Sequence, residues 1–180
     1  MKITDFLTKD RIVFDLESKS KSNILREMAE LFEDGTIIEG KEGLFYNDLK
    51  EREDTTSTGM QDGLAVPHAK SAAISKLAIA LAITKNGVDF NSMDGEPSRV
   101  FFMIAAPEDT KREHLNLLSL ISKFSYEDEL MEELLTTNDK DRVIEMLSTI
   151  EDTIQILDEN YGTERTAEDL KINIGCVCVI

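Results

Sequence analysis

Two uncharged apolar runs constrain the fold of this chain more than any other feature. The first reads Leu-Ala-Ile-Ala-Leu-Ala-Ile-Thr from Leu77 to Thr84, and the second reads Val-Phe-Phe-Met-Ile-Ala-Ala from Val100 to Ala106. Neither run alternates between apolar and polar residues, as a strand with one face in water would. Both are therefore predicted to be central strands that are buried on both faces, and Pro107 ends the second.

Segments with helical periodicity surround these two strands. Residues 21–32 repeat apolar side chains at the spacing of one helix face, and Asn86-Gly87 is typical of a turn. Further elements are predicted as helices over residues 41–53, 113–124, 128–135 and 139–150, and as short strands over residues 11–16 and 64–66. The pattern predicts an α/β fold, a three-layer sandwich with a central mixed β-sheet of about five strands flanked by helices on both faces.

The length of the chain favours a single large domain. Its 180 residues are enough for one well-filled core, which we assign to residues 1–150. Residues 151–180 are interpreted as an acidic linker and a strand-like C-terminal tail, because Lys171 to Ile180 is rich in β-prone residues. No apolar stretch approaches the roughly 20 residues that span a bilayer, and the N-terminus lacks the pattern of a secretory signal.

Charge and cysteine content narrow the class of partner. A net charge of −16 argues against nucleic acid as the main partner, because phosphate backbones favour patches of Lys and Arg. It also argues against an anionic membrane surface, and it suits either simple solubility or docking of a basic protein. The two cysteines, Cys176 and Cys178, cannot build a disulfide framework, so we expect a cytoplasmic protein.

The chain has only two histidines, and each is predicted to follow a strand. Pro67 ends a brief strand directly before His68, and His114 lies in the first turn of a helix after a short polar loop. Ligands of open α/β sheets bind beyond strand ends, so we expect both imidazoles in that zone. Neutral imidazole can act there as nucleophile, base or proton shuttle. From the residues alone, a surface histidine without a role stays open as an interpretation.

A guanidinium and two hydroxyls precede the first histidine. Arg52 stands at the end of the helix of residues 41–53, and Ser57 and Thr58 follow in a polar loop. Arginine is the preferred fork for phosphate, and Ser and Thr hydroxyls can donate to phosphate oxygens. These three are the candidate phosphate-binding residues. The alternative interpretation is a solvated helix-end charge followed by ordinary turn residues.

A long ordered pattern of residues carries a resemblance to a known family. It consists of Arg52-Glu53, Ser57-Thr58-Gly59, Gly-Leu-Ala-Val-Pro-His from Gly63 to His68, and His-Leu-Asn-Leu-Leu from His114. Over residues 1–150 the chain resembles the fructose/mannitol-type enzyme IIA domains of the bacterial phosphoenolpyruvate-dependent sugar phosphotransferase system. The nitrogen-regulatory enzyme IIA proteins share this domain. The family commonly has glycine where this chain has Ala69, which narrows the backbone freedom beside the histidine.

The resemblance implies a phosphotransferase that carries a phosphoryl group. His68 would accept the group from the phosphocarrier protein HPr and pass it to an enzyme IIB partner, and His114 would support the site. The three candidate phosphate-binding residues would stabilise the group, and no metal or organic cofactor would be required. The segment from Lys171 to Cys178 faintly resembles the first strand of a fructose-type enzyme IIB domain. Since the loop that should follow that cysteine is absent, no activity is assigned to Cys178.

Three other functions are weighed against this one. A regulatory nitrogen-type enzyme IIA would use its phosphorylation state to control a partner rather than to feed sugar uptake. A metal-dependent hydrolase or metal-binding module could use His68, His114 and a carboxylate, although the chain has no His-x-x-x-His or Cys-x-x-Cys pair. A purely structural interaction module would have no phosphorylation chemistry.

Overall fold

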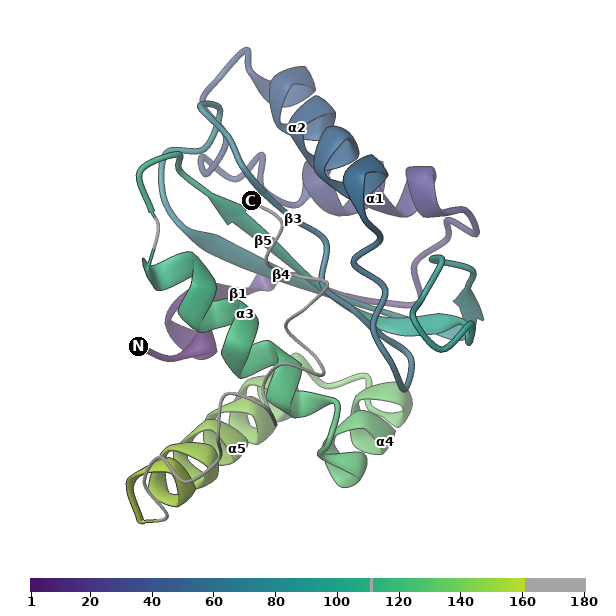
Figure 1. Cartoon of the computed structure of the whole chain (residues 1–180), viewed down its shortest axis with the longest axis vertical. Coiled ribbons are helices and arrows are strands. Elements are labelled where there is room, and N and C mark those ends of the chain that lie inside the picture. Colours follow the sequence, from purple (N-terminus) through teal and green to yellow (C-terminus); the bar gives the residue numbers. More distant parts are fainter. Residues whose placement is uncertain (111, 161–180) are drawn as a thin grey trace.

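The chain folds around a mixed β-sheet that helices cover on both faces (Figure 1). The computed structural model describes residues 1–110 and 112–160. The strands are β1 (Leu7–Phe14), β2 (Leu64–Ala65), β3 (His68–Lys70), β4 (Ala78–Val88) and β5 (Ser98–Ala106). The helices are a 3₁₀ turn η1 (Ile3–Asp5), α1 (Lys21–Glu30), α2 (Glu42–Thr55), α3 (Arg112–Phe124), α4 (Asp128–Thr136) and α5 (Lys140–Asn160). The predicted α/β sandwich is confirmed.

Strand β5 is the central organiser of the sheet. The strand order is β1-β4-β5-β2, and β3 also pairs with β5. Strand β4 runs antiparallel to β5, whereas β2 and β3 are parallel to β5 and lie one after the other along it. In this register Leu64 is beside Val100, and His68 is beside Ile104. The chain between β2 and β3 is therefore held against β5 on both sides of Pro67.

The two faces of the sheet differ in the size of their side chains. On β4, one set of alternate residues is large and shares an apolar cluster with α3, α4 and α5: Ile79, Leu81 and Ile83. The other set is small and shares a second cluster with α1 and α2: Ala78, Ala80 and Ala82. The alternation of large and small residues thus fits a strand with a helical layer on each face, where interiors are close-packed.

The turn predicted at Asn86-Gly87 is wrong, because β4 continues through these residues to Val88. The register with β5 shifts between Ile83 and Val88, as at a β-bulge. Gly87 has φ +71° in this irregularity, a conformation that glycine adopts without a Cβ penalty. A Cβ at this position would also lie 2.7 Å from Pro97 Cβ. The glycine thus serves a bulge inside a strand rather than a chain reversal.

Helix α5 extends beyond its predicted end at residue 150 and continues to Asn160. Its last part packs against the N-terminus: Glu151 accepts hydrogen bonds from Ile3 N and from Thr4 Oγ1. Ile154 is buried in the same region. Residues 151–160 are therefore helical and not an extended linker, and the strand-like segment predicted from Lys171 lies outside the described residues.

Replacing either of two neighbouring phenylalanines tests whether both faces of the sheet are closed. Phe101 and Phe102 are fully buried on opposite faces, against Phe90 and Phe124 respectively. Phe101→Ala and Phe102→Ala should each lower the free energy of unfolding by about 3–5 kcal/mol in urea titrations. Tyr126→Ala is the control, since this exposed aromatic should cost less than about 0.5 kcal/mol. A near-neutral Phe101 or Phe102 variant would mean that its face of the sheet is open.

Candidate functional site

His68 is the first residue of β3 and is held in a defined orientation. Pro67 lies in the two-residue gap between β2 and β3, and both of these short strands pair with β5 in one continuous register. The imidazole is buried, and its Nδ1 lies 2.7 Å from the carbonyl oxygen of Val66. A carbonyl oxygen can only accept, so Nδ1 carries the hydrogen and Nε2 keeps a free lone pair. The backbone therefore presents Nε2 as the nucleophilic atom of this ring.

His114, on helix α3, lies next to the His68 ring. It lies in the first turn of α3, and the two ring centroids are 5.2 Å apart with planes tilted by 57°. The His114 side chain is buried, and its Nε2 has no hydrogen-bond partner in the described part of the chain. The structure thus brings together the two imidazoles that the sequence placed beyond the strand ends. Within the described residues it leaves the buried His114 Nε2 without a hydrogen-bond partner.

Both imidazoles are neutral at physiological pH. Burial lowers the pKa of His68 from 6.5 to about 4; the Val66 carbonyl opposes this shift and the charge of Arg52 adds to it. Burial likewise lowers the pKa of His114 to about 3, and the charges of His68, Lys70 and Arg52 contribute further. A neutral ring with a free lone pair is the form that can attack phosphorus.

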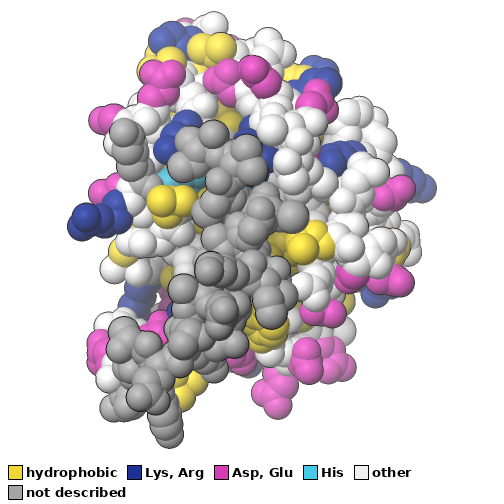
Figure 2. All heavy atoms as spheres, viewed as in Figure 1, with side chains coloured by type: hydrophobic (Ala, Val, Ile, Leu, Met, Phe, Trp, Pro, Cys, Tyr) yellow, Lys and Arg dark blue, Asp and Glu magenta, His cyan; other side chains and the backbone are white. Residues whose placement is uncertain are grey.

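A narrow cleft opens beside His68 between α2, α3 and the loops that follow α2 and β4. Its lining residues are Arg52, Ser57, Thr58, Gly59, Met60, Val66, His68, Met93, Leu118 and Ser122. In the space-filling view, a small patch of histidine surface is bordered by Lys or Arg side chains and by hydrophobic side chains (Figure 2). Four of the five predicted site residues line the cleft, and His114 joins them through its ring contact with His68.

Arg52 and Lys70 bring two positive charges near the imidazoles in an otherwise acidic chain. Arg52, in the last turn of α2, donates from Nη1 to the carbonyl of Thr56 at 3.0 Å and acts on both imidazoles through its charge. Lys70 lies two residues after His68 on β3, and its charge is felt by His114. Cations at this site favour a bound phosphoryl group.

The hydroxyls of Ser57 and Thr58 line the cleft, but both are already engaged with the protein. Ser57 Oγ donates to the carbonyl of Phe90 at 2.7 Å, and Thr58 Oγ1 donates to Glu53 Oε2 at 2.5 Å. In this structure both hydroxyls help to shape the loop, and their binding of phosphate stays a prediction.

Several residues of the site were not singled out from the sequence. Leu118 and Ser122 follow His114 at intervals of four residues, so helical spacing could have placed them on one face. Met93 reaches the cleft from a distant loop, and no local pattern marks it. Glu53 was noted only as part of the family pattern, although its carboxylate is buried beside Thr58.

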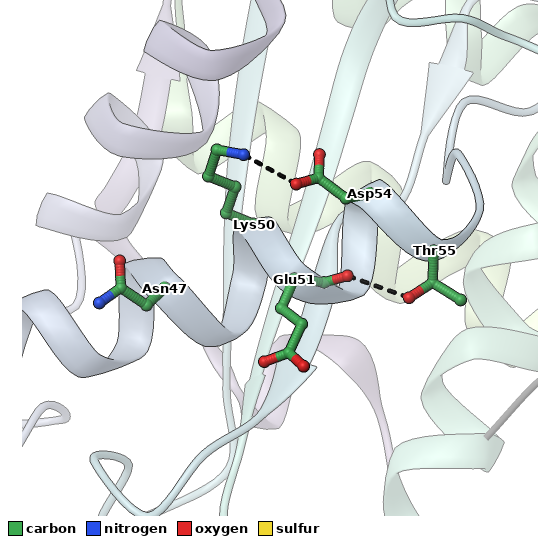
Figure 3. A pocket seen from close by; sticks show the side chains of 5 residues that line it. All are labelled: Asn47, Lys50, Glu51, Asp54 and Thr55. Atoms are coloured by element: carbon green, nitrogen blue, oxygen red, sulfur yellow. Dashed lines mark hydrogen bonds and ion pairs between the residues drawn. The ribbon is translucent and has the colours of Figure 1, made fainter.

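A second hollow lies on the outer surface of α2 and has a different character. All of its lining side chains come from this one helix: Asn47, Lys50, Glu51, Asp54 and Thr55 (Figure 3). Lys50 and Asp54 form an exposed ion pair at 2.7 Å, one helical turn apart. Exposed pairs of this kind are ordinary helix-surface features. The hollow holds no histidine, so we assign no chemistry to it.

Membrane-spanning helices and metal-binding clusters are both absent from residues 1–110 and 112–160. Within these ranges, no helix is both long and apolar enough to cross a membrane. In the same ranges, no group of three or more His, Cys, Asp or Glu side chains is arranged to hold a metal ion.

The structure thus places two buried imidazoles and an arginine at the gap between β2 and β3 of a helix-covered mixed sheet. Residues 5–150 match the family described as "Phosphoenolpyruvate-dependent sugar phosphotransferase system, EIIA 2". The chain belongs to this family of enzyme IIA domains, as the resemblance predicted, and the family supports a phosphocarrier role.

Individual relatives include both sugar-transport and regulatory proteins. The chain is 36% identical over 148 residues to the fructose-specific EIIABC component of Bacillus subtilis (strain 168); the match covers 82% of this chain but only 23% of that protein. The crystal structure of nitrogen regulatory protein IIA-Ntr from Neisseria meningitidis has a TM-score of 0.74 and 32% identity, covering 81% of this chain and 98% of that chain.

A third relative is similar in fold. In the complex of enzyme IIAMTL and phosphorylated enzyme IIBMTL from Escherichia coli, the matched chain has a TM-score of 0.68 and 21% identity. The match covers 79% of this chain and 97% of that chain. In that complex the enzyme IIA chain is bound to a phosphorylated enzyme IIB.

The two lowered pKa values predict that acid destabilises the protein. Between pH 7.5 and pH 5, the unfolded chain protonates histidines whose ordinary pKa is 6.5, while the folded chain keeps them neutral. The free energy of unfolding should therefore decrease as the pH is lowered from 7.5 to 5, by about 2 kcal/mol for each histidine. His114→Gln should remove about half of this histidine-dependent loss in urea titrations at the two pH values. A variant that keeps the whole wild-type loss would show that His114 titrates normally in the folded state.

Proposed function

We propose that this protein is a phosphocarrier that accepts a phosphoryl group from phospho-HPr on His68 and passes it to an enzyme IIB partner for sugar uptake. The observation that carries this proposal is the hydrogen bond from His68 Nδ1 to the Val66 carbonyl, which leaves Nε2 free. This function requires the protein to meet its phosphoryl donor in the cytoplasm. Membership of the enzyme IIA family supports the assignment.

The chemistry needs one bond to form as another breaks. His68 Nε2 attacks the phosphorus of the donor phosphohistidine, the donor P–N bond breaks, and its electron pair returns to the departing imidazole. The His68 ring gains positive character as the new P–N bond forms, and the Val66 carbonyl stabilises it by accepting from Nδ1–H. Onward transfer repeats the step with an enzyme IIB nucleophile. Positioning and charge stabilisation are the main demands of such a reaction.

Arg52 and His114 are placed to stabilise the phosphoryl group in this proposal. The Arg52 guanidinium lines the cleft beside His68 and adds positive charge where phosphoryl oxygens would lie. Among the described residues His114 Nε2 is a buried polar atom without a hydrogen-bond partner, and such an atom costs about 1–3 kcal/mol until it is satisfied. A hydrogen bond from His114 to a phosphoryl oxygen would recover that cost. Ser57 and Thr58 then contribute by shaping the loop below the group.

Removing the acceptor tests the proposal directly. When the purified chain is incubated with labelled phosphoenolpyruvate, enzyme I and HPr, the wild type should acquire acid-labile label. His68→Ala should acquire none, because the substitution removes the nitrogen that the Val66 carbonyl leaves free to attack. Circular dichroism should show that the variant is folded. Acid-labile label on folded His68→Ala would place the acceptor elsewhere and end the assignment.

Replacing the second histidine separates acceptance from onward transfer. His114→Ala should still take up label on His68, since the acceptor nitrogen is oriented by Val66 and not by His114. Transfer to an enzyme IIB should be impaired by about ten- to a hundred-fold, because one stabilising contact to the phosphoryl group is lost. Single-turnover transfer from the labelled protein measures this rate. Unimpaired transfer would remove His114 from the mechanism.

A regulatory role is the second candidate function, and one observation favours it. The Neisseria meningitidis nitrogen regulatory protein matches this chain with 32% identity and a TM-score of 0.74, so the similarity includes a regulatory protein. In this case His68 would be phosphorylated in the same way, and the phosphorylation state would alter binding to a target protein. Transfer of label to an enzyme IIB favours transport; a phospho-form that donates to none and only changes target binding favours regulation.

A further inference from the structure

A buried carboxylate supports the loop beside His68. Glu53 stands in the last turns of α2, and only 4% of its surface is exposed. Its Oε1 accepts from the backbone N of Thr58 at 2.8 Å and pairs with Lys21 Nζ at 2.7 Å. Its Oε2 accepts from Thr58 Oγ1 at 2.5 Å. Both carboxylate oxygens are therefore committed to holding one residue and one counter-ion.

Stability alone does not account for a carboxylate at this place. Burying an ion pair carries a desolvation cost that its attraction often fails to offset. An acid near the C-terminal end of a helix also faces the negative end of the helix dipole. Glu53 meets both conditions, so we look for its role in the residues that it orients.

Thr58, the residue that Glu53 holds, is linked to His68 through the backbone of Val66. The carbonyl of Thr58 accepts from the backbone N of Val66 at 3.0 Å. The carbonyl of Val66 in turn accepts from His68 Nδ1 at 2.7 Å. A continuous series of hydrogen bonds thus runs from Glu53 through Thr58 and Val66 to the imidazole. The atom at its end is the one that determines which nitrogen of His68 is free.

Lys21 anchors the other side of the same loop. Its Nζ donates to Ser57 Oγ at 3.3 Å and to the Phe90 carbonyl at 3.2 Å, and it lies 4.7 Å from the centroid of the Phe90 ring. Ser57 Oγ also accepts from the backbone N of Gly59 at 3.1 Å. Lys21 therefore neutralises Glu53 and ties the loop to the chain that follows β4.

We propose that Glu53, with Lys21 as its counter-ion, is a positioning residue for phosphoryl transfer: it fixes Thr58 and thereby the Val66 carbonyl that selects the reactive tautomer of His68. This inference rests on the proposed function, in which His68 is the acceptor. Glu53 contacts no reacting atom and acts only through Thr58 and Val66. Its loss should release the Val66 carbonyl, so that part of the His68 population carries its hydrogen on Nε2 and cannot attack.

The experiment compares two matched variants of the full chain. Glu53→Gln removes the charge of the carboxylate that holds Thr58. Glu151→Gln is the control, because Glu151 is also a buried helix carboxylate that accepts from a backbone N–H and from a threonine hydroxyl, those of Ile3 and Thr4. Proton–nitrogen correlation spectra at pH 7.5 report the tautomer of each imidazole, and the ring that is absent in His68→Gln identifies His68.

The expected result has a spectroscopic and a kinetic part. Glu53→Gln should show a mixed His68 tautomer and a maximal rate of phosphorylation by phospho-HPr about ten- to a hundred-fold lower, with KM for phospho-HPr changed less than about two-fold. Glu151→Gln should keep the wild-type tautomer and rate even if it is less stable. A folded Glu53→Gln variant with the wild-type tautomer and rate would overturn the proposal.

Two variants of Thr58 decide the matter if Glu53→Gln does not fold. Thr58→Val removes the hydroxyl that donates to Glu53, and Thr58→Ser restores it. A tautomer shift in Thr58→Val that is reversed in Thr58→Ser supports the positioning role, and unchanged tautomers in both contradict it. The tautomer is read without phosphorylation. A wild type that takes no label on His68 therefore ends the proposed function, while the spectra still decide whether Glu53 positions the ring.

Discussion

The hydrogen bond between His68 Nδ1 and the Val66 carbonyl is the interaction on which the rest of the site depends. It assigns the hydrogen of a neutral ring to one nitrogen and leaves the other with a lone pair toward the cleft. Burial keeps that ring neutral, and the positively charged Arg52 lines the same cleft. Without this hydrogen bond, burial alone would give a neutral imidazole with no preferred nucleophilic atom.

The sheet supplies the rigidity that this one hydrogen bond requires. Strands β2 and β3 both pair with β5, so the Val66-Pro67 segment between them is restrained at both ends. Helix α3 packs on one face of the sheet and presents His114, whereas α2 covers the other face and ends near the cleft with Arg52. The site thus forms where both helical layers meet the gap between β2 and β3. The layer of α3 contributes an imidazole, and the layer of α2 contributes a guanidinium.

Much of this arrangement could be predicted from the sequence, because local patterns encode it. Two uncharged runs identified the central strands, and two histidines, one after the short strand 64–66 and one after the second central strand, pointed to one shared zone. The remainder depends on contacts between distant residues. The acidic residues after position 150 suggested a linker, yet α5 continues to Asn160, and Glu151 and Ile154 are buried on it. Nothing local showed that Glu53 would be buried against Lys21, 32 residues earlier, or that Gly87 would form a bulge.

The central claim is that the backbone selects which nitrogen of His68 carries the phosphoryl group. The most direct measurement is to phosphorylate the wild type through enzyme I and HPr and to identify the phosphohistidine isomer by phosphorus–nitrogen NMR at alkaline pH. Because Nδ1 is committed to the Val66 carbonyl, the phosphoryl group should be found on Nε2 of His68. A phosphoryl group on Nδ1, or on any residue other than His68, would contradict the account.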